Sequence, residues 1–405
     1  MKPKERTIYF VWNYLRWGGA QVYFLSVIKR TCHDWNVVVI LPKDSSKEFL
    51  GFLKELGAKC IFLEEAIDLE PAQGVRQILS RQLLRIRSEI AIFNLLRSAG
   101  IKGEIVHIEA APWQSWQLIT MLVLLGAHVF VTLHTFRLEG SIIRKLVWKA
   151  RMQFVSRLPR FHAFASNVYA KERYRDWFAR TFASNVKVTY TAVDPEHIAE
   201  AAAANARGRL REQFEISNVD KVVLTVGQFV DLKGRWDLLD AAADVISIRD
   251  DVVFVWLMQD AMDEEAARRV EEYWLGERFR PITSAEAGGS RQRILEFFCV
   301  ADIFVLPSHL EGLPIALLEA MALEIPSIST NIYAIPEAII DGSTGLLVEP
   351  RRPDQLSEAI LKLLNDENLC RSLAREGSRR VLSTFDEGTS AGTVIAEYNK
   401  AIGAK

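Results

Sequence analysis

The sequence has few cysteines, no uninterrupted run of membrane-spanning character and almost no net charge. Its four cysteines lie far apart, with no CxxC pair and no neighbouring pair of histidines, which argues against both a zinc site and a disulfide framework. The apolar run near the N-terminus lacks a small-residue cleavage site, so we expect no secretory signal peptide. These absences favour a protein of the reducing cytoplasm.

Charge is unevenly distributed although its sum is only −1. Residues 1–200 carry 28 Lys and Arg against 18 Asp and Glu, net +10, which leaves 22 and 33, net −11, for residues 201–405. Two interpretations stay open. The halves attract one another across a cleft between domains, or the basic half meets an anionic partner such as a membrane surface or a phosphorylated substrate.

Residues 110–136 contain no Lys, Arg, Asp or Glu and are long enough to cross a bilayer as a single helix. Polar and helix-breaking residues interrupt the stretch at Pro112, Gln114, Gln117, Gly126 and His128. Its second part, HVFVTLHTF, has the β-branched and aromatic content of a buried parallel strand. We therefore predict a packed helix followed by a strand.

Apolar runs of strand length alternate with segments of helical period along most of the chain. The alternation stops near VKVTYTAVDPEHI, passes through an alanine-rich helical segment and restarts at KVVLTVGQF. Such alternation predicts an α/β fold of two domains, each a parallel sheet with crossover helices, with the boundary near residues 195–215. Three further helices are expected at the C-terminal end, over residues 353–365, 367–382 and 387–402.

Ligands of open parallel sheets bind at the carboxyl ends of the strands, so residues that follow strands are the first candidates for a site. Gly18 and Gly19 follow the first strand, where a backbone could approach a phosphate or a sugar, although a plain tight turn explains them as well. In the second half Gly227 follows a strand. Lys233 and Arg235 come shortly afterwards and could bracket a diphosphate, or could simply be exposed cations of a solvated loop.

The most informative stretch is FVLPSHLEGLPIALLEAMA, in which a strand is followed by a turn and a helix. Gly312 suits the turn and Pro314 suits the first position of the helix, which would offer free N–H groups to an anion. Glu311 lies before the helix and Glu319 about a turn and a half inside it, so the two carboxylates can reach different parts of one elongated ligand.

A carboxylate accepts two hydroxyl hydrogen bonds, as recognition of a vicinal diol requires. The pattern therefore favours a ligand with phosphate in the middle and a polyol at each end, which describes a nucleotide sugar. The alternative is that Glu311 complements the helix dipole and Glu319 is a surface residue. The apolar residues around Glu319 in the sequence weaken that alternative.

One histidine has a setting that suits a ligand site, because VTLHTF ends a predicted strand with His134. A side chain there can face a cleft as a hydrogen-bond partner, although a single histidine is often structural. No comparable setting is found for His33, His128, His162 and His197.

With these residues in view, the chain resembles the retaining nucleotide-sugar glycosyltransferases of the GT-B fold, family 4, over nearly its whole length. The resemblance is strongest over residues 301–350, which carry an E-x7-E motif as Glu311 and Glu319, then PE and DGSTGLLV. Weaker matches are GGAQ near the N-terminus, VGQFVDLKG as a phosphate-binding loop and AVDPEHI at the end of the first domain.

The resemblance implies two Rossmann-like domains facing a cleft. Residues 1–198 would bind the acceptor, residues 199–385 the donor, and the helix in 386–405 would return to the first domain. It implies that Glu311 contacts the donor sugar, Glu319 the ribose and Lys233 the diphosphate, with His134 beside the transferred sugar. The other implied donor contacts are Gly18, Gly19, Gly227, Gln228, Gly312, Leu313, Pro314 and Ile315. Neither a metal nor another cofactor is expected, because cations and helix N–H groups can stabilise the departing diphosphate.

Several positions depart from the family pattern. Gln228 stands where the family often has arginine, a role that Arg235 could fill, and residues 257–264 lack the glycines expected after the strand. Glu324 replaces a glycine that usually ends the helix, and Thr191-Ala192 replaces Asn-Gly. Two other functions stay open: a nucleotide-sugar epimerase on the same fold, which needs no acceptor, and a non-catalytic nucleotide-sugar-binding protein.

Residues 137–160 carry seven basic residues and one acid among aliphatic and aromatic ones. Such a helix can lie on an anionic bilayer, which predicts a peripheral enzyme on the cytoplasmic face of the membrane that glycosylates a glycan or a lipid-linked acceptor. Residues 76–97 are also basic and amphipathic, and we expect an ordinary helix with a basic outer face there. No nucleic-acid-binding module accompanies the basic surface, so no nucleic-acid partner is expected.

Overall fold

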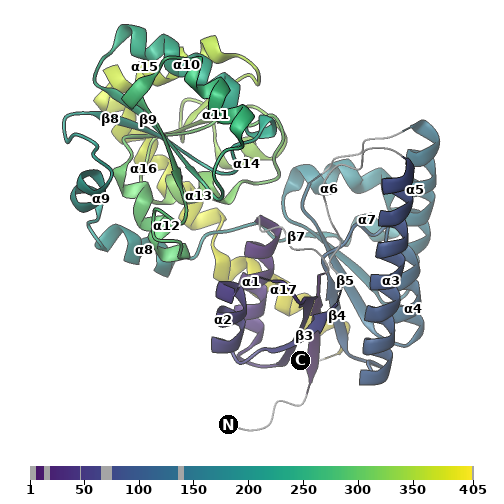
Figure 1. Ribbon diagram of the computed structural model, residues 1–405. Helices are drawn as coiled ribbons and strands as arrows, with labels where there is room; N and C mark the ends of the chain where they lie inside the picture. Colours follow the sequence, from purple (N-terminus) through teal and green to yellow (C-terminus); the bar gives the residue numbers. More distant parts are fainter. Residues whose placement is uncertain (1–5, 13–18, 46, 65–74, 136–140, 404–405) are drawn as a thin grey trace. The chain divides into compact units, whose positions relative to one another are not determined.

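The computed structural model describes residues 6–12, 19–45, 47–64, 75–135 and 141–403 (Figure 1). Contacts divide the chain into unit 1, Met1–Thr191 with Gly388–Lys405, and unit 2, Ala192–Glu387. The first division lies a few residues before the expected boundary at 198, because helix α8 (Pro195–Ala203) packs against helix α12 (Arg291–Phe297) of unit 2.

Unit 1 is built on one parallel sheet in the order β3-β2-β1-β4-β5-β6-β7. The strands are β1 (Thr7–Val11), β2 (Asn36–Pro42), β3 (Lys59–Leu63), β4 (Ile105–Ile108), β5 (His128–Leu133), β6 (Phe161–Ala165) and β7 (Lys187–Val188). The helices are α1 (Gly19–Thr31), α2 (Lys47–Glu55), α3 (Val75–Ala99), α4 (Trp116–Leu124), α5 (Ile142–Val155), α6 (Val168–Tyr174), α7 (Arg180–Ala183) and α17 (Glu387–Ala401). Near-continuous apolar strands such as β1 and β2 are buried on both faces, as helices on both sides of a parallel sheet require.

Unit 2 repeats this plan with the order β10-β9-β8-β11-β12-β13, again all parallel. The strands are β8 (Lys221–Val226), β9 (Val252–Met258), β10 (Phe279–Thr283), β11 (Ile303–Leu306), β12 (Ser327–Thr330) and β13 (Leu346–Val348). The remaining helices are α9 (Arg207–Gln213), α10 (Arg235–Ile248), α11 (Glu264–Glu271), α13 (Ile315–Ala322), α14 (Ile335–Ala338), α15 (Pro353–Asn365) and α16 (Glu367–Thr384). The predicted α/β class with two Rossmann-like sheets is confirmed.

The uncharged stretch 110–136 contains α4 and β5, as its composition predicted. Both belong to the core of unit 1, where Leu118, Leu122 and Val131 are fully or almost fully buried. Within the described ranges, no helix is both long and apolar enough to cross a membrane.

The last helix, α17, belongs to unit 1, so the expectation that it returns to the first domain is confirmed. Val394 and Tyr398 on α17 are fully buried in the same apolar cluster as Phe10 of β1 and Phe24 of α1. A polar bond adds to this packing, because the Tyr398 hydroxyl is hydrogen-bonded to Nδ1 of His107 on β4. These contacts tie residues nearly 300 positions apart in the sequence into one core.

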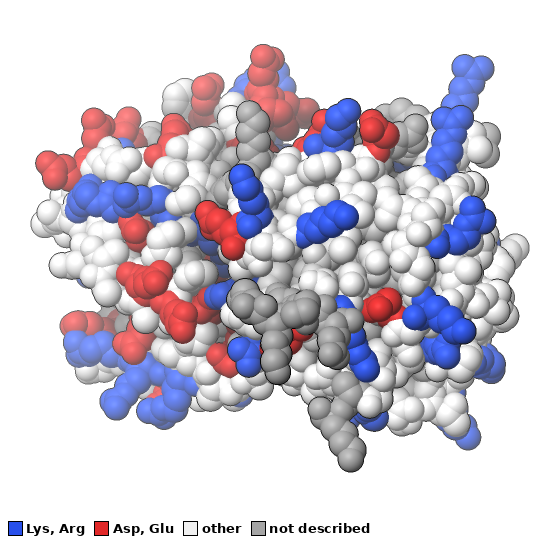
Figure 2. All heavy atoms as spheres, turned by 90° about the horizontal axis from the view of Figure 1, so that it is seen from below, with Lys and Arg blue, Asp and Glu red and all other residues white. Residues whose placement is uncertain are grey.

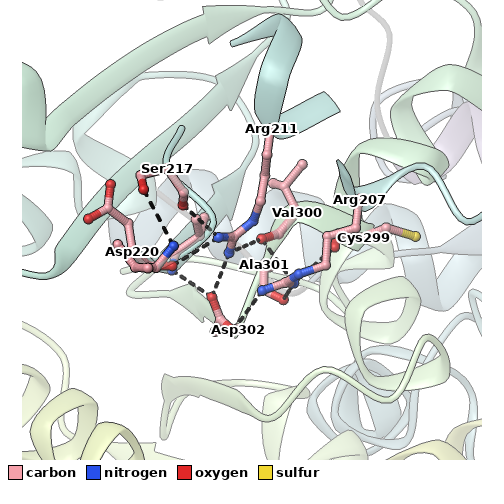
Figure 3. A network of polar contacts seen from close by, with 10 residues as sticks. Arg207, Arg211, Ser217, Asp220, Cys299, Val300, Ala301 and Asp302 are labelled. Atoms are coloured by element: carbon pink, nitrogen blue, oxygen red, sulfur yellow. Dashed lines mark hydrogen bonds and ion pairs between the residues drawn. The ribbon is translucent and has the colours of Figure 1, made fainter. Parts of the chain in front are cut away.

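In unit 2 a charged network fastens α9 to the sheet (Figure 3). Asp302, just before β11, accepts from Arg207 Nη2 and Arg211 Nη2, each at 2.8 Å, and from the N–H of Val222 on β8, also at 2.8 Å. Arg211 is 1% exposed, and its guanidinium also donates to the carbonyls of Ser217, Asp220 and Val300. The network lies at the amino ends of β8 and β11, so we assign it to the fold and not to ligand binding.

We expect unit 1 to lose stability as the pH falls below about 6.5. Burial, aided by the nearby charge of His134, lowers the pKa of His107 to about 3, and burial, aided by His128 and Lys400, lowers that of His162 to about 4. The unfolded chain takes up these protons near pH 6.5 and the folded chain does not, so acid favours unfolding. The contribution is complete above pH 6.5 and is lost as the pH falls toward the folded values.

Urea unfolding followed between pH 7 and pH 5 measures this effect. The free energy of unfolding should fall by roughly 1–2 kcal/mol for each histidine at pH 5, above the range where most carboxylates titrate. A free energy that stays constant or rises over this interval would contradict the assignment of His107 and His162 as buried neutral groups.

Candidate functional site

The loops that follow β8 and β11 meet in unit 2, because these neighbouring strands start the two halves of the sheet. This is the position at which open parallel sheets bind ligands. Gly234, which ends the first loop, has φ +69°, and a Cβ placed on it would lie 2.0 Å from the carbonyl oxygen of Pro307 in the second loop. Only glycine permits this approach of the two backbones.

The close approach brings Lys233 beside Glu311, and Lys233 Nζ forms an ion pair with Glu311 Oε1. The same carboxylate oxygen accepts a hydrogen bond of 2.8 Å from the hydroxyl of Ser308. Exposed fractions are 24% for the Lys233 side chain and 9% for that of Glu311. An ammonium has three N–H donors, so Lys233 can keep Glu311 and still donate to a ligand oxygen.

Arg235, the other cation of the loop after β8, is held by its own surroundings. Its Nε donates to Asp231 Oδ1 at 2.8 Å and its Nη1 to the carbonyl oxygen of Phe229 at 3.0 Å. The guanidinium also lies 4.4 Å from the ring centroid of Trp236. Arg235 thus stabilises the loop. Gln228, which takes the place of a family arginine, has an exposed side chain, and Gly227 at the end of β8 has φ +152°.

Glu319 lies on α13 and is 2% exposed. Its Oε1 accepts from Nη2 of Arg291, the first residue of α12. Burial raises the pKa of Glu319, and the nearby Arg291 charge opposes that shift. The alternative of a surface glutamate is therefore wrong. Arg291 is itself 42% exposed at its side chain, so it can move to admit a ligand without leaving a buried charge of its own.

The start of α13 differs from the expectation by one residue. Pro314 is the N-cap, with φ −73° and ψ 121°, and the helix begins at Ile315. The difference follows from ψ, because an extended ψ places Pro314 outside the helical turn. The free N–H groups still belong to Ile315 and Ala316 at the carboxyl end of β11. Leu313 is 5% exposed and anchors the turn, and Gly312 lies in that turn.

In unit 1 His134 follows β5 and is paired with Glu109, which follows β4, with Nε2 and Oε2 3.1 Å apart. The exposed fractions of these two side chains are 16% and 13%. The His134 ring meets that of Tyr23 edge-on at 5.3 Å, and its carbonyl oxygen accepts from Asn167 Nδ2 at 2.9 Å. Gly19 is the first residue of α1, and Gly18 lies outside the described residues.

Several polar residues of these sites were not found from the sequence. His309 Nε2 lies 2.6 Å from Asp237 Oδ2 of α10, and the N–H of His309 donates to the Leu232 carbonyl. Arg291 and Glu109 are also new. Only Ser308 and His309 carried a sequence signal, because they directly follow a predicted strand. Among the described residues, no group of three or more His, Cys, Asp or Glu side chains could hold a metal ion.

The fold of this chain is similar to that of solved glycosyltransferase structures. A solved structure, that of Anabaena Alr3699/HepE in complex with UDP, is similar to this chain with a TM-score of 0.75 at 15% identity, and the similarity covers 98% of this chain and all of that one. A crystal structure of a glycosyltransferase from Rickettsia africae is similar with the same TM-score at 16% identity, over 98% of both chains. The chain therefore has the GT-B fold of glycosyltransferases.

Residues 206–380 match the family model described as glycosyl transferases group 1. Over 96% of its length the chain is 26% identical to the N,N'-diacetylbacillosaminyl-diphospho-undecaprenol alpha-1,3-N-acetylgalactosaminyltransferase of Campylobacter jejuni, of which 98% is covered. Residues 206–380 of this chain, somewhat less than half of it, therefore match the group 1 glycosyltransferases, and the similarity to the Campylobacter relative extends over nearly the whole chain, in line with the sequence prediction.

Other relatives are matched over less of their length. The chain is 36% identical over 91 residues to the capsular polysaccharide biosynthesis glycosyltransferase CapM of Staphylococcus aureus, which is 22% of this chain and 24% of CapM. The further matches cover between 24% and 54% of the relatives concerned.

The end of α13 gives a test of the local geometry that holds Glu319. Glu324 has φ +57° in a Schellman turn, in which the N–H of Ile325 donates to the Ala320 carbonyl and that of Glu324 to the Met321 carbonyl. A non-glycine residue in the left-handed conformation costs about 1–2 kcal/mol. Glycine removes this cost, but its greater freedom in the unfolded chain cancels part of the gain in stability.

We expect Glu324→Gly to raise the free energy of unfolding by about 0.5–1 kcal/mol, measured by urea unfolding. Glu324 is exposed, so no packing is lost. Glu324→Ala removes the same charge but keeps Cβ, and it is the matched control that should show no comparable gain. Equal gains in both variants would mean that charge and not backbone conformation is at issue.

Proposed function

We propose that the protein is a retaining glycosyltransferase that moves a sugar from a UDP- or GDP-sugar to a glycan or a lipid-linked acceptor. The observation that carries the proposal is the pairing of Lys233 with Glu311 where the loops after β8 and β11 meet, with buried Glu319 on the helix that follows. A cation, free helix N–H groups and two carboxylates suit the parts of a nucleotide sugar.

The relatives support this assignment. The Campylobacter relative is named for transfer of N-acetylgalactosamine to a diphospho-undecaprenol-linked sugar, and CapM for capsular polysaccharide biosynthesis. The Anabaena protein of the same fold has been solved with UDP and with UDP-glucose. These ligands belong to those proteins, and they support a nucleotide sugar and a glycan acceptor for this one.

In the proposed reaction Lys233 contacts the diphosphate, Glu311 the donor sugar and Glu319 the ribose hydroxyls. Gly227, Gln228, Gly312, Leu313, Pro314 and Ile315 would supply the backbone and loop around the donor. The helix N–H groups and Lys233 would stabilise the charge that develops on the leaving diphosphate, so the proposal includes no metal and no other cofactor. Retention would follow from attack on the face from which the diphosphate leaves, with the leaving phosphate accepting the acceptor proton. The role of His134 beside the transferred sugar stays a prediction.

Calorimetric titration of UDP and GDP into the wild type and into Glu319→Gln tests the donor site. One nucleotide should bind the wild type, and the variant should lose about 1–3 kcal/mol, roughly 5- to 150-fold in Kd, because a buried hydrogen-bond acceptor is removed.

Glu296→Gln is the matched control for this titration. Glu296 is 8% exposed and pairs with Arg209 and Arg293 at 3.1 and 2.7 Å, yet it is given no ligand contact. Equal losses in both variants would assign Glu319 to the fold. Binding of neither nucleotide to the wild type would remove the transferase proposal, and turnover of a donor without any acceptor would favour the epimerase.

We further propose that unit 1 associates with the cytoplasmic face of a membrane through α5. Residues 142–147 are all exposed, and Ile142, Ile143 and Leu146 are 78%, 75% and 61% exposed among Arg144 and Lys145. On unit 1, Figure 2 shows Lys and Arg side chains on a largely uncharged surface with few acidic ones. An exposed apolar face with cations beside it is typical of helices that lie in the interface of anionic bilayers.

Co-sedimentation with vesicles of phosphatidylglycerol and phosphatidylcholine tests this association. The wild type should sediment with the anionic vesicles. A variant with serine at 142, 143 and 146 should remain largely in the supernatant, because it lacks the three exposed aliphatic side chains that would enter the bilayer. Serine at Val219 and Ile248, which are 79% and 67% exposed in unit 2, is the control. Failure of the wild type to sediment would remove the proposal.

A further inference from the structure

Two arginines from different helices of unit 1 meet on the segment that follows β4. Arg85 of α3 donates from Nη1 to Gln114 Oε1 at 3.2 Å, and Arg151 of α5 donates from Nη1 to the carbonyl oxygen of Trp113 at 3.5 Å. Since the segment follows a parallel strand at its carboxyl end, it lies at the edge of the sheet where ligands bind.

A third guanidinium joins them. Arg144 lies 4.5 Å from the centroid of the Trp148 ring, which is 6.2 Å from that of Trp113. Burial lowers the pKa of Arg85, the negative charge of Glu89 opposes that shift, and the charges of Arg151 and Arg144 lower it further. Three cations thus share their surroundings with one carboxylate.

These cations have no carboxylate partner in an ion pair among the described residues. The arrangement is the opposite of the Asp302 network, where the guanidinium groups converge on a carboxylate and on carbonyl oxygens (Figure 3). Three guanidinium groups beside a single carboxylate that forms no ion pair with them leave an excess of positive charge, which an added anion could neutralise.

Further donors of the same segment lack acceptors. Trp113 is 7% exposed, and its buried Nε1 and that of Trp116 have no hydrogen-bond partner within the described chain. Helix α4 begins at Trp116 without a side-chain cap from Ser115, so that side chain satisfies none of the first N–H groups of the helix. Buried Glu89 Oε1 lacks a donor as well, and burial raises the pKa of this carboxyl group. An oxygen-rich anion that also carries a hydroxyl group satisfies both kinds of atom.

We propose that Arg85, Arg144 and Arg151, with the Trp113 indole N–H and the start of α4, bind a phosphate or diphosphate group carried by the acceptor. That this group belongs to an acceptor rests on the proposed transferase function; the anion site itself does not. The site differs from the diphosphate contact assigned to Lys233, which lies in unit 2. The anion site in unit 1 limits the proposed acceptor to a molecule that carries a phosphate or a diphosphate.

Inorganic pyrophosphate, titrated calorimetrically and by tryptophan fluorescence, is the probe. Wild type should bind it, and Arg151→Gln and Arg144→Gln should each weaken binding about tenfold or more, since each removes a charge-assisted hydrogen-bond donor. Lys145→Gln removes an exposed charge from the same helix and should change Kd less than about twofold. Lys233→Ala should leave this binding event in place, because it alters only unit 2.

The source of the phosphate is tested with two kinds of vesicle of equal surface charge, one containing phosphatidylglycerol and the other a polyprenyl diphosphate in phosphatidylcholine. The proposal predicts that Arg151→Gln weakens binding to the diphosphate vesicles far more than Lys187→Gln does, which removes an exposed charge of unit 1 outside α5. Equal effects of the two variants, or loss of pyrophosphate binding only in Lys233→Ala, would overturn it. UDP titration of the same samples keeps the two accounts separate: UDP binding without pyrophosphate binding in unit 1 overturns the acceptor site alone.

Discussion

The contact of Gly234 with the Pro307 carbonyl is the constraint on which the site in unit 2 depends. A Cβ at Gly234 would lie 2.0 Å from that oxygen, so the two loops can approach only because the side chain is absent. Their approach places Lys233 against Glu311 and Ser308. The backbone of α10 also begins at this point, so the turn that brings the loops together also sets the direction of the first crossover helix.

The arginines of the Asp302 network in unit 2 and those of the proposed anion site in unit 1 differ in whether a carboxylate pairs with them. Arg207 and Arg211 in unit 2 are matched by Asp302 and by carbonyl oxygens, and they fasten α9 to the sheet. Arg85 and Arg151 in unit 1 donate to the Gln114 amide and the Trp113 carbonyl, and neither they nor Arg144 forms an ion pair with a carboxylate among the described residues. If the proposed anion site exists, an anionic partner accounts for part of the excess of positive charge in the first half of the sequence, and attraction between the two halves stays the alternative.

Much of the fold could be predicted from the sequence, because the periods of apolar residues differ between buried strands and helices. The helices expected over 353–365, 367–382 and 387–402 are observed within two residues at each end. The site was harder to predict, because its pairs join residues far apart in the chain. His309 and Asp237 are 72 positions apart and Arg291 and Glu319 are 28 apart, and no local pattern records such a contact. Which cation of Lys233 and Arg235 faces Glu311 was likewise decided by tertiary contacts.

Hydrogen exchange of the backbone amides, measured with and without the nucleotide that binds, tests most directly whether the junction of the loops after β8 and β11 is the donor site. The account predicts slower exchange in peptides that cover residues 227–235 and 309–319, with little change around Asp302 at the opposite end of the same strands. Protection that is absent from those two segments, or confined to unit 1, would contradict it.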